Sequence, residues 1–297
     1  MTIGKFMLIT VAGLILCNSA FAQDDAKPSK YELSIFAAGG LSALKFDVTD
    51  GDAKAGAGGS FGAGLYYSVS DRWSVGSGLE LSLYSSKAAL NTVSDRYAAN
   101  DGEYNFEFRT AISGYEENQN AMYLTVPLLA RFQIPVIGES RFYVAGGFKF
   151  GIPVSAGGKV TKAVLQNSGY YPVWSGGSEL VLDTQNFMGF GTFEQRNVDR
   201  NLDLKAAFFV SLESGIRFKT GKTTALYAGA YLDWGLNDVR SNPVKRLVEY
   251  SSTHPAEFTH NSLLLSQRTS ANGKTEPLTG KAIPVAAGIK LRFSFAL

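Results

Sequence analysis

Residues 121–153 read AMYLTVPLLARFQIPVIGESRFYVAGGFKFGIP, and this stretch decides the fold. Over 121–134 apolar side chains occupy every second position, and residues 141–153 resume the alternation after a connection of six residues. A period of two is that of a strand whose two faces meet different surroundings. The stretch therefore predicts two antiparallel strands joined by a tight turn.

Eight segments of the chain alternate in this way: 31–46, 59–70, 73–86, 121–134, 141–153, 204–218, 225–237 and 282–297. The connections after the second, fourth and sixth segments are short, at 70–72, 135–140 and 220–223, whereas the last three of the other connections each exceed thirty residues. Short turns at one end and long loops at the other are typical of outer-membrane barrels. We expect an all-β fold over 31–297, an eight-stranded antiparallel up-and-down transmembrane β-barrel with long extracellular loops.

The first residues predict export. Lys5 precedes an apolar run over 6–16, and Ala20 and Ala22 supply small residues for cleavage before Gln23. Residues 1–22 are thus a predicted signal peptide, and 23–30 a predicted N-terminal periplasmic segment. A lipoprotein signal at Cys17 is the less favoured alternative, because that motif needs a small residue where Leu16 stands.

Composition agrees with a membrane β-barrel. Charged residues make up 18% of the chain, aromatic residues 12%, and there are 32 glycines, whereas soluble domains carry about 25% charged residues. Beyond the signal no run approaches the roughly 18 apolar residues of a membrane helix. The net charge of +2 gives no reason to expect nucleic acid as a partner.

The polar faces of the segments mix charged residues with Gly, Ala and Ser, which suits a crowded interior better than a solvated surface. We therefore assign the apolar faces to lipid, with a soluble lipocalin-like barrel of opposite orientation as the alternative. Aromatic residues near the short turns would form the periplasmic girdle: Tyr67, Trp73, Phe132, Phe142 and Phe218.

The predicted inward charges nearly balance. They are Glu32, Glu80, Arg131, Lys149, Glu213, Arg217, Asp233, Lys290 and Arg292. Side chains fill the interior of an eight-stranded barrel, and buried charges need partners. We expect an ion-pair network that closes the lumen, with Glu213 beside Arg217 or Arg131. The alternative role for these residues is a proton or ion path.

Residues 123–132, YLTVPLLARF, resemble the YLxxPLLxxY/F strand of the PorT-like outer-membrane β-barrel family, and 261–266, NSLLLS, resembles a further segment of it. The resemblance covers essentially the whole mature chain and implies a small barrel similar to the OmpA/OmpX type. The usual terminal aromatic residue is displaced here, because Phe295 precedes the final Leu297. Some family members are implicated in protein secretion and gliding.

Signals for chemistry are weak. Residues 58–62 match G-x-S-x-G but run into an alternating strand rather than a strand–turn–helix. The two histidines, His254 and His260, read as loop residues, and Asp47, Asp50 and Asp52 as turn chemistry. We predict no catalytic residue, no metal ligand, no cofactor and no enzymatic activity.

We expect the long loops to contain the functional residues, because binding residues are often found on loops that a rigid scaffold positions. Residues 87–120 and 154–203 are rich in aromatic residues, which form either a binding surface or a compact cap. The Tyr104–Arg109 alternation indicates strands that continue above the membrane. The expected partners are outer-membrane lipid, the barrel-assembly machinery during biogenesis, and a protein or glycan at the loops. The expected role is structural or interactive, and the alternatives are a subunit of a secretion or transport assembly, or a small porin.

Overall fold

The computed structural model describes residues 30–174, 177–242, 245–270 and 272–297, so the predicted signal peptide and nearly all of the predicted periplasmic segment lie outside the described residues. The eight longest strands are β1 (Tyr31–Lys45), β3 (Ala57–Ser68), β4 (Trp73–Leu90), β6 (Asn105–Pro135), β7 (Arg141–Tyr171), β11 (Ala207–Lys219), β12 (Thr224–Gly235) and β18 (Ile283–Ala296). The shorter elements are β2 (Gly51–Ala55), β5 (Val93–Asn100), β8 (Leu180–Leu182), η3 (Asn186–Met188), β9 (Gly191–Gln195), β10 (Val198–Asn201), β13 (Lys245–Arg246), β14 (Val248–Glu249), β15 (Thr259–His260), η4 (Leu263–Leu265), β16 (Ser266–Thr269) and β17 (Thr275–Pro277).

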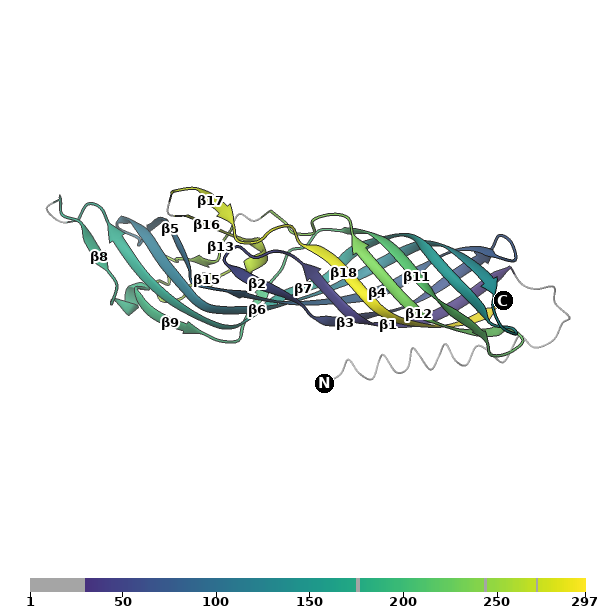
Figure 1. Ribbon diagram of the computed structural model, residues 1–297. Coiled ribbons are helices and arrows are strands. Elements are labelled where there is room, and N and C mark those ends of the chain that lie inside the picture. Colours follow the sequence, from purple (N-terminus) through teal and green to yellow (C-terminus); the bar gives the residue numbers. More distant parts are fainter. Residues whose placement is uncertain (1–29, 175–176, 243–244, 271) are drawn as a thin grey trace.

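The eight long strands pair in chain order and close on themselves. Each pairs antiparallel with the next, in the order β1, β3, β4, β6, β7, β11, β12 and β18, and β18 returns to β1. Figure 1 shows the strands of this ring crossing obliquely around a common axis, with the C-terminus at its short-turn end. The predicted all-β antiparallel class and the eight predicted segments are thus confirmed.

The three predicted short turns join strands of the ring at one end. In the first turn the Ser70 hydroxyl accepts from the Trp73 backbone N–H. In the second, Gly138 takes a φ of 58°, a left-handed conformation that glycine adopts without a steric cost. In the third, the Thr220 N–H bonds to the Thr224 carbonyl. These tight connections set the hairpin registers of the ring.

Several predicted strand limits were too narrow. β6 and β7 each run for 31 residues, about 100 Å at 3.3 Å per residue, and they continue far beyond the ring (Figure 1). Strand β5 pairs with the upper part of β6, and β8, β9 and β10 pair with the upper part of β7. The expectation that strands extend into the long connections is therefore confirmed, and we call β5–β10 above the ring the upper sheet.

The two faces of the ring are sorted as predicted. Each strand exposes a large apolar residue outward: Ile35 50%, Leu65 45%, Leu79 56%, Leu128 65%, Phe148 63%, Leu212 51%, Leu232 39% and Leu291 52% exposed. Inward neighbours such as Arg131 and Lys149 are only 1% and 3% exposed. The soluble alternative, with the apolar faces packed inside, is wrong for this chain.

Above the ring the long connections pack inward to form an apolar core. The last connection, 236–282, contributes Leu263 and Leu264, which are completely buried in η4, and Leu247 and Leu278 pack into the same core. Figure 1 places β13, β16 and β17 at the junction of the ring and the upper sheet. No described helix is long and apolar enough to span a membrane.

Candidate functional site

The interior of the ring holds a buried network of ion pairs. Lys149 donates to Glu80 and to Asp233, at 2.8 Å in both cases. Lys290 and Arg292 donate to the two carboxylate oxygens of Glu213, at 2.5 and 2.7 Å. A 4.0 Å contact from Lys290 to Glu80 joins the two groups. Every one of these side chains is at most 4% exposed, so each charge depends on its partner for compensation.

A second cluster lies nearer the short turns. Arg131 donates to Glu32 at 2.9 Å and to the Ser74 hydroxyl at 3.0 Å. Its guanidinium lies 4.2 Å from the ring centre of Tyr66 and 4.8 Å from that of Tyr227, as in cation–π contacts. The Tyr227 hydroxyl donates to the other oxygen of Glu32 at 2.9 Å. The Arg131 guanidinium and the Glu32 carboxylate therefore pair with each other, and Ser74 and Tyr227 are their further hydrogen-bond partners.

Eight of the nine predicted inward charges therefore lie in these two clusters. The ninth, Arg217, is only half-buried, and its guanidinium lies 5.8 Å from the Tyr227 ring centre. No ion pair of Arg217 occurs among the residues that the structure describes. The predicted partners of Glu213 were wrong, because Lys290 and Arg292 on β18 hold it while Arg131 pairs with Glu32.

Interior tyrosines complete the site and were not predicted as part of it. Tyr66, Tyr84, Tyr123, Tyr143 and Tyr227 are at most 4% exposed. Gly76 leaves room for one of them, since a Cβ there would collide with the Tyr66 ring. The cavity among Phe36, Tyr66 and Arg292 is about 10 Å³, which is at the lower limit for one water molecule. Their positions were the available signal, because all of these tyrosines except Tyr66 stand an even number of residues from an inward charge on the same strand and so share its face.

At the upper end of the ring the last connection is tied to β6. Glu117, 1% exposed, accepts from the Ser262 hydroxyl at 2.6 Å, the Leu263 N–H at 2.9 Å and the Tyr115 hydroxyl at 2.5 Å. Ser262 also caps η4 by accepting from the Leu264 N–H. We call the segment Thr259–Thr269, held in this way, the cap.

His260 belongs to the cap and is half-buried beside Phe258. Burial, with a smaller contribution from Arg200, lowers the pKa of His260 to about 4. The imidazole is therefore neutral at neutral pH. His254 is exposed in the same connection.

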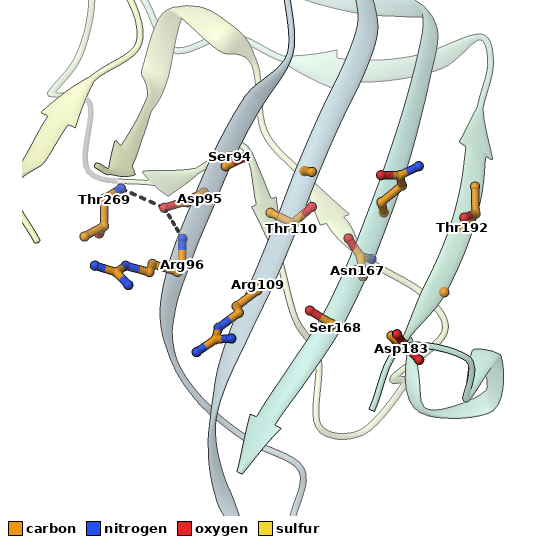
Figure 2. Close-up of a pocket in the computed structure, with 13 residues that line it drawn as sticks. Ser94, Asp95, Arg96, Arg109, Thr110, Asn167, Ser168, Asp183, Thr192 and Thr269 are labelled. Carbon is orange, nitrogen blue, oxygen red and sulfur yellow. Dashed lines mark hydrogen bonds between the residues drawn. The ribbon is translucent and has the colours of Figure 1, made fainter. Parts of the chain in front are cut away.

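A groove of about 740 Å³ lies on the upper sheet. Figure 2 shows residues of β5, β6, β7 and β9 around it, including Arg96, Arg109 and Ser168, with Asp183 at one side. Three backbone rows define it: Ser94–Ala111–Gln166–Thr192, Asp95–Thr110–Asn167–Gly191 and Arg96–Arg109–Ser168. Its lining residues carry hydroxyl, amide, carboxylate or guanidinium groups, except Ala111 and Gly191.

Asp95 fixes one edge of the groove. Its carboxylate accepts from the Thr269 and Arg96 backbone N–H groups at 2.7 and 2.9 Å, the two contacts drawn in Figure 2, and from the Arg246 guanidinium at 3.0 Å. Burial raises the pKa of Asp95 despite these donors. The contacts join β5 to β13 and β16, so the cap and the groove share one rigid edge.

The loop aromatic residues mostly pack against one another. Phe106, Phe108, Tyr171 and Phe190 form a buried cluster, with the Phe106 and Tyr171 rings stacked at 5.0 Å. These aromatic residues therefore pack the loops into a compact unit, which is the second of the two interpretations that the sequence allowed. Apolar side chains remain exposed in β8 and the connections on either side of it, where Val173 is 72%, Val181 52% and Phe187 77% exposed.

The remaining motifs assemble no reactive centre. Ser60 of the G-x-S-x-G match lies within β3, opposite Ala38 and Ser82, and both histidines belong to the last connection. Asp50 has a φ of 58° in its turn and pairs with Arg268 at 2.7 Å. No group of three His, Cys, Asp or Glu side chains that could hold a metal occurs in the described ranges.

Residues 21–241 match the model of a family described as outer membrane protein beta-barrel domain. Among solved structures, the chain is similar to Neisserial surface protein A (NspA), with 9% sequence identity, a TM-score of 0.35, and coverage of 91% of this chain and 98% of that one. No curated protein matches the chain.

Proposed function

We propose that this chain, which belongs to the outer membrane protein beta-barrel domain family, crosses the bacterial outer membrane as an eight-stranded barrel with a closed lumen and acts through its upper sheet. The observation that carries the proposal is the outward apolar residue on every strand of the ring, from Ile35 on β1 to Leu291 on β18. Water is a poor environment for such a surface, whereas lipid is a good one.

The interior supports a closed lumen. The buried cations Lys149, Lys290 and Arg292 are neutralised by Glu80, Asp233 and Glu213. The rings of Tyr66 and Tyr227 lie against Arg292 of this network and against Arg131 of the second cluster. The cap contributes a second seal above them, with Leu263 and Leu264 completely buried. This arrangement supports a structural role for the charges over the ion-path and small-porin alternatives.

The role of the upper sheet, in this proposal, is binding without catalysis. The groove presents Gln166, Ser168 and Thr192 beside Arg96 and Arg109. Donors and acceptors in this density suit a polar, hydroxyl-rich partner such as a glycan. The contacts that fix Asp95 at the edge of the groove, from Thr269, Arg96 and Arg246, favour a preformed site.

A second candidate is a protein partner, and exposed apolar side chains of the upper sheet favour it. Val173, Val181 and Phe187, in β8 and the connections on either side of it, are each more than half exposed. Such a surface would suit a subunit of a secretion or transport assembly, which is also what the finer resemblance to the PorT-like family implies.

Two experiments test these proposals. Envelope fractionation with N-terminal sequencing should recover a chain that begins at Gln23 in the outer membrane, and recovery in a soluble fraction would contradict the location. A glycan array should then give signals that Q166A/S168A/T192A removes and that T220A, at the opposite end of the ring, leaves unchanged. Cross-linking at Phe187 to another envelope protein, with a blank glycan array, would favour the assembly subunit instead.

A further inference from the structure

Three exposed lysines lie in one row across the outside of the sheet. Lys54 on β2 is the register partner of Lys87 on β4, Lys87 that of Asn118 on β6, and Asn118 that of Lys159 on β7. Register partners point to the same face of a sheet, and neighbouring strands are about 4.8 Å apart. We call Lys54, Lys87 and Lys159 the lysine row.

The ammonium groups of the lysine row have no ion-pair partner. Among the described residues none of them makes an ion pair or a hydrogen bond: Asp199 on β10, the register partner of Lys159, lies beyond ion-pair distance, and so do Asp52 and Glu116, which lie two residues from Lys54 and Asn118 on the same face. Lys54 and Lys87 face each other directly, and like charges so placed destabilise a sheet. An external anion would relieve this repulsion.

The height of the row on the barrel identifies the anion's surroundings. On β4 the outward face is apolar from Trp73 to Leu83 except at Ser77, a stretch of ten residues that rises about 25 Å along the barrel axis at the usual strand tilt. Lys87 follows four residues later, about 10 Å higher by the same geometry. On β7 the outward face is likewise apolar through Phe148, Phe150, Ile152 and Val154, and then reaches Lys159.

Lipid headgroups add about 5–8 Å to each side of the bilayer core, so the backbone of the row lies just above the headgroup layer. Lysine side chains bend toward that layer from above. The ammonium groups are then placed among headgroup phosphates, which they bind as point charges. Asn118 supplies an amide donor between Lys87 and Lys159 in the same row.

We propose that Lys54, Lys87 and Lys159 form a binding site for the phosphate groups of an anionic lipid in the outer leaflet. The site rests on the proposed crossing of the membrane, because only that orientation brings the row to the headgroups. It is distinct from the groove, which lies higher on the upper sheet.

The test is binding of a fluorescent phosphatidic acid to the full chain in neutral detergent micelles, with phosphatidylcholine as the uncharged comparison. K54Q/K87Q/K159Q should weaken phosphatidic acid binding about 100-fold, which corresponds to about 3 kcal/mol for three lysines at a membrane surface. The matched control K222Q/K245Q/K274Q removes the same charge from exposed lysines that share no row, and it should change binding less than about threefold. Lys→Arg changes at the three row positions should retain binding.

Equal losses in the row and control variants, or no loss in either, would overturn the proposal. Equally tight binding of inorganic phosphate alone would show an anion site without lipid, and would overturn it as well. Insertion into phosphatidylcholine vesicles, read by protease protection of the ring, separates the two levels of inference. A chain that inserts but does not prefer phosphatidic acid refutes the lipid site alone, whereas a chain that does not insert refutes the proposed function and the site with it.

Discussion

Removing the carboxylate of Glu213 should strongly destabilise the ring. Glu213 receives Lys290 at 2.5 Å and Arg292 at 2.7 Å, and all three side chains are at most 3% exposed. Glu213→Ala therefore leaves two cations buried without their partner. One-sided loss of a buried pair costs about 3–5 kcal/mol, and the presence of two stranded cations places the expected loss at the upper end of that range.

The assay is equilibrium unfolding in denaturant of the chain folded in lipid vesicles, followed by tryptophan fluorescence. Glu139→Ala is the matched control, because the Glu139–Lys219 pair is 71% and 36% exposed and such pairs contribute about 0–1 kcal/mol. Glu213→Gln should lie between the two, since it keeps an acceptor but loses the charge. Free energies of unfolding for Glu213→Ala and Glu139→Ala within 1 kcal/mol of each other would refute the reasoning.

Two further predictions concern the outer face and the cap. Leu128→Arg, Leu212→Arg and Leu291→Arg, at positions 65%, 51% and 52% exposed, should each cost about 2–4 kcal/mol of folding free energy in vesicles, and equal tolerance at all three in denaturant titrations would count against a lipid-facing surface. Because the pKa of His260 is about 4 in the folded chain, below its ordinary value of 6.5, the folded cap binds fewer protons than the open one. Stability of the cap should therefore be complete above pH 6.5 and fall between pH 6.5 and 4, and limited proteolysis of the cap should show that His260→Gln loses this dependence.

The sequence predicted the faces of the ring well because two opposite environments impose a strict alternation. On β6, Val126 and Leu128 face outward and are apolar, whereas Thr125 and Arg131 face the interior and are polar. The residue type at each position therefore indicates which face it lies on. The same logic placed eight of the nine inward charges. Arg217 differs because it lies near the short-turn end, where the interior opens to solvent and a partner is not required.

The ion-pair partner of each buried charge could not be predicted from the sequence, because it depends on the register between strands. Glu213 on β11 meets Lys290 and Arg292 on β18, with β12 between them in the sheet. Strand tilt and stagger decide such contacts, and neither is encoded in local alternation. The lysine row needs the same information, since Lys54, Lys87 and Lys159 are brought into line only by the registers of three strand pairs.

The upper sheet was only partly predicted, because the contrast between its faces is weaker. Residues such as Ser94, Gln166 and Thr192 are polar on the exposed side, but Asp95, Thr110 and Asn167 are polar and buried on the same strands. Because apolar residues do not recur at every second position in β5, β9 and β10, the sequences of these strands resemble those of loops. The aromatic residues Phe106 and Phe108 were the main signal of a continuing strand.

Planar-bilayer recording of the refolded chain tests the central claim most directly. The buried ion pairs around Glu80, Lys149 and Glu213, together with the cap, predict a barrel that inserts into the bilayer without porin-like conductance. Insertion is verified in the same preparation by protease protection. Stable, large single-channel steps from the unmodified chain would contradict the closed lumen, whereas a verified insertion with a quiet baseline is the result that we expect.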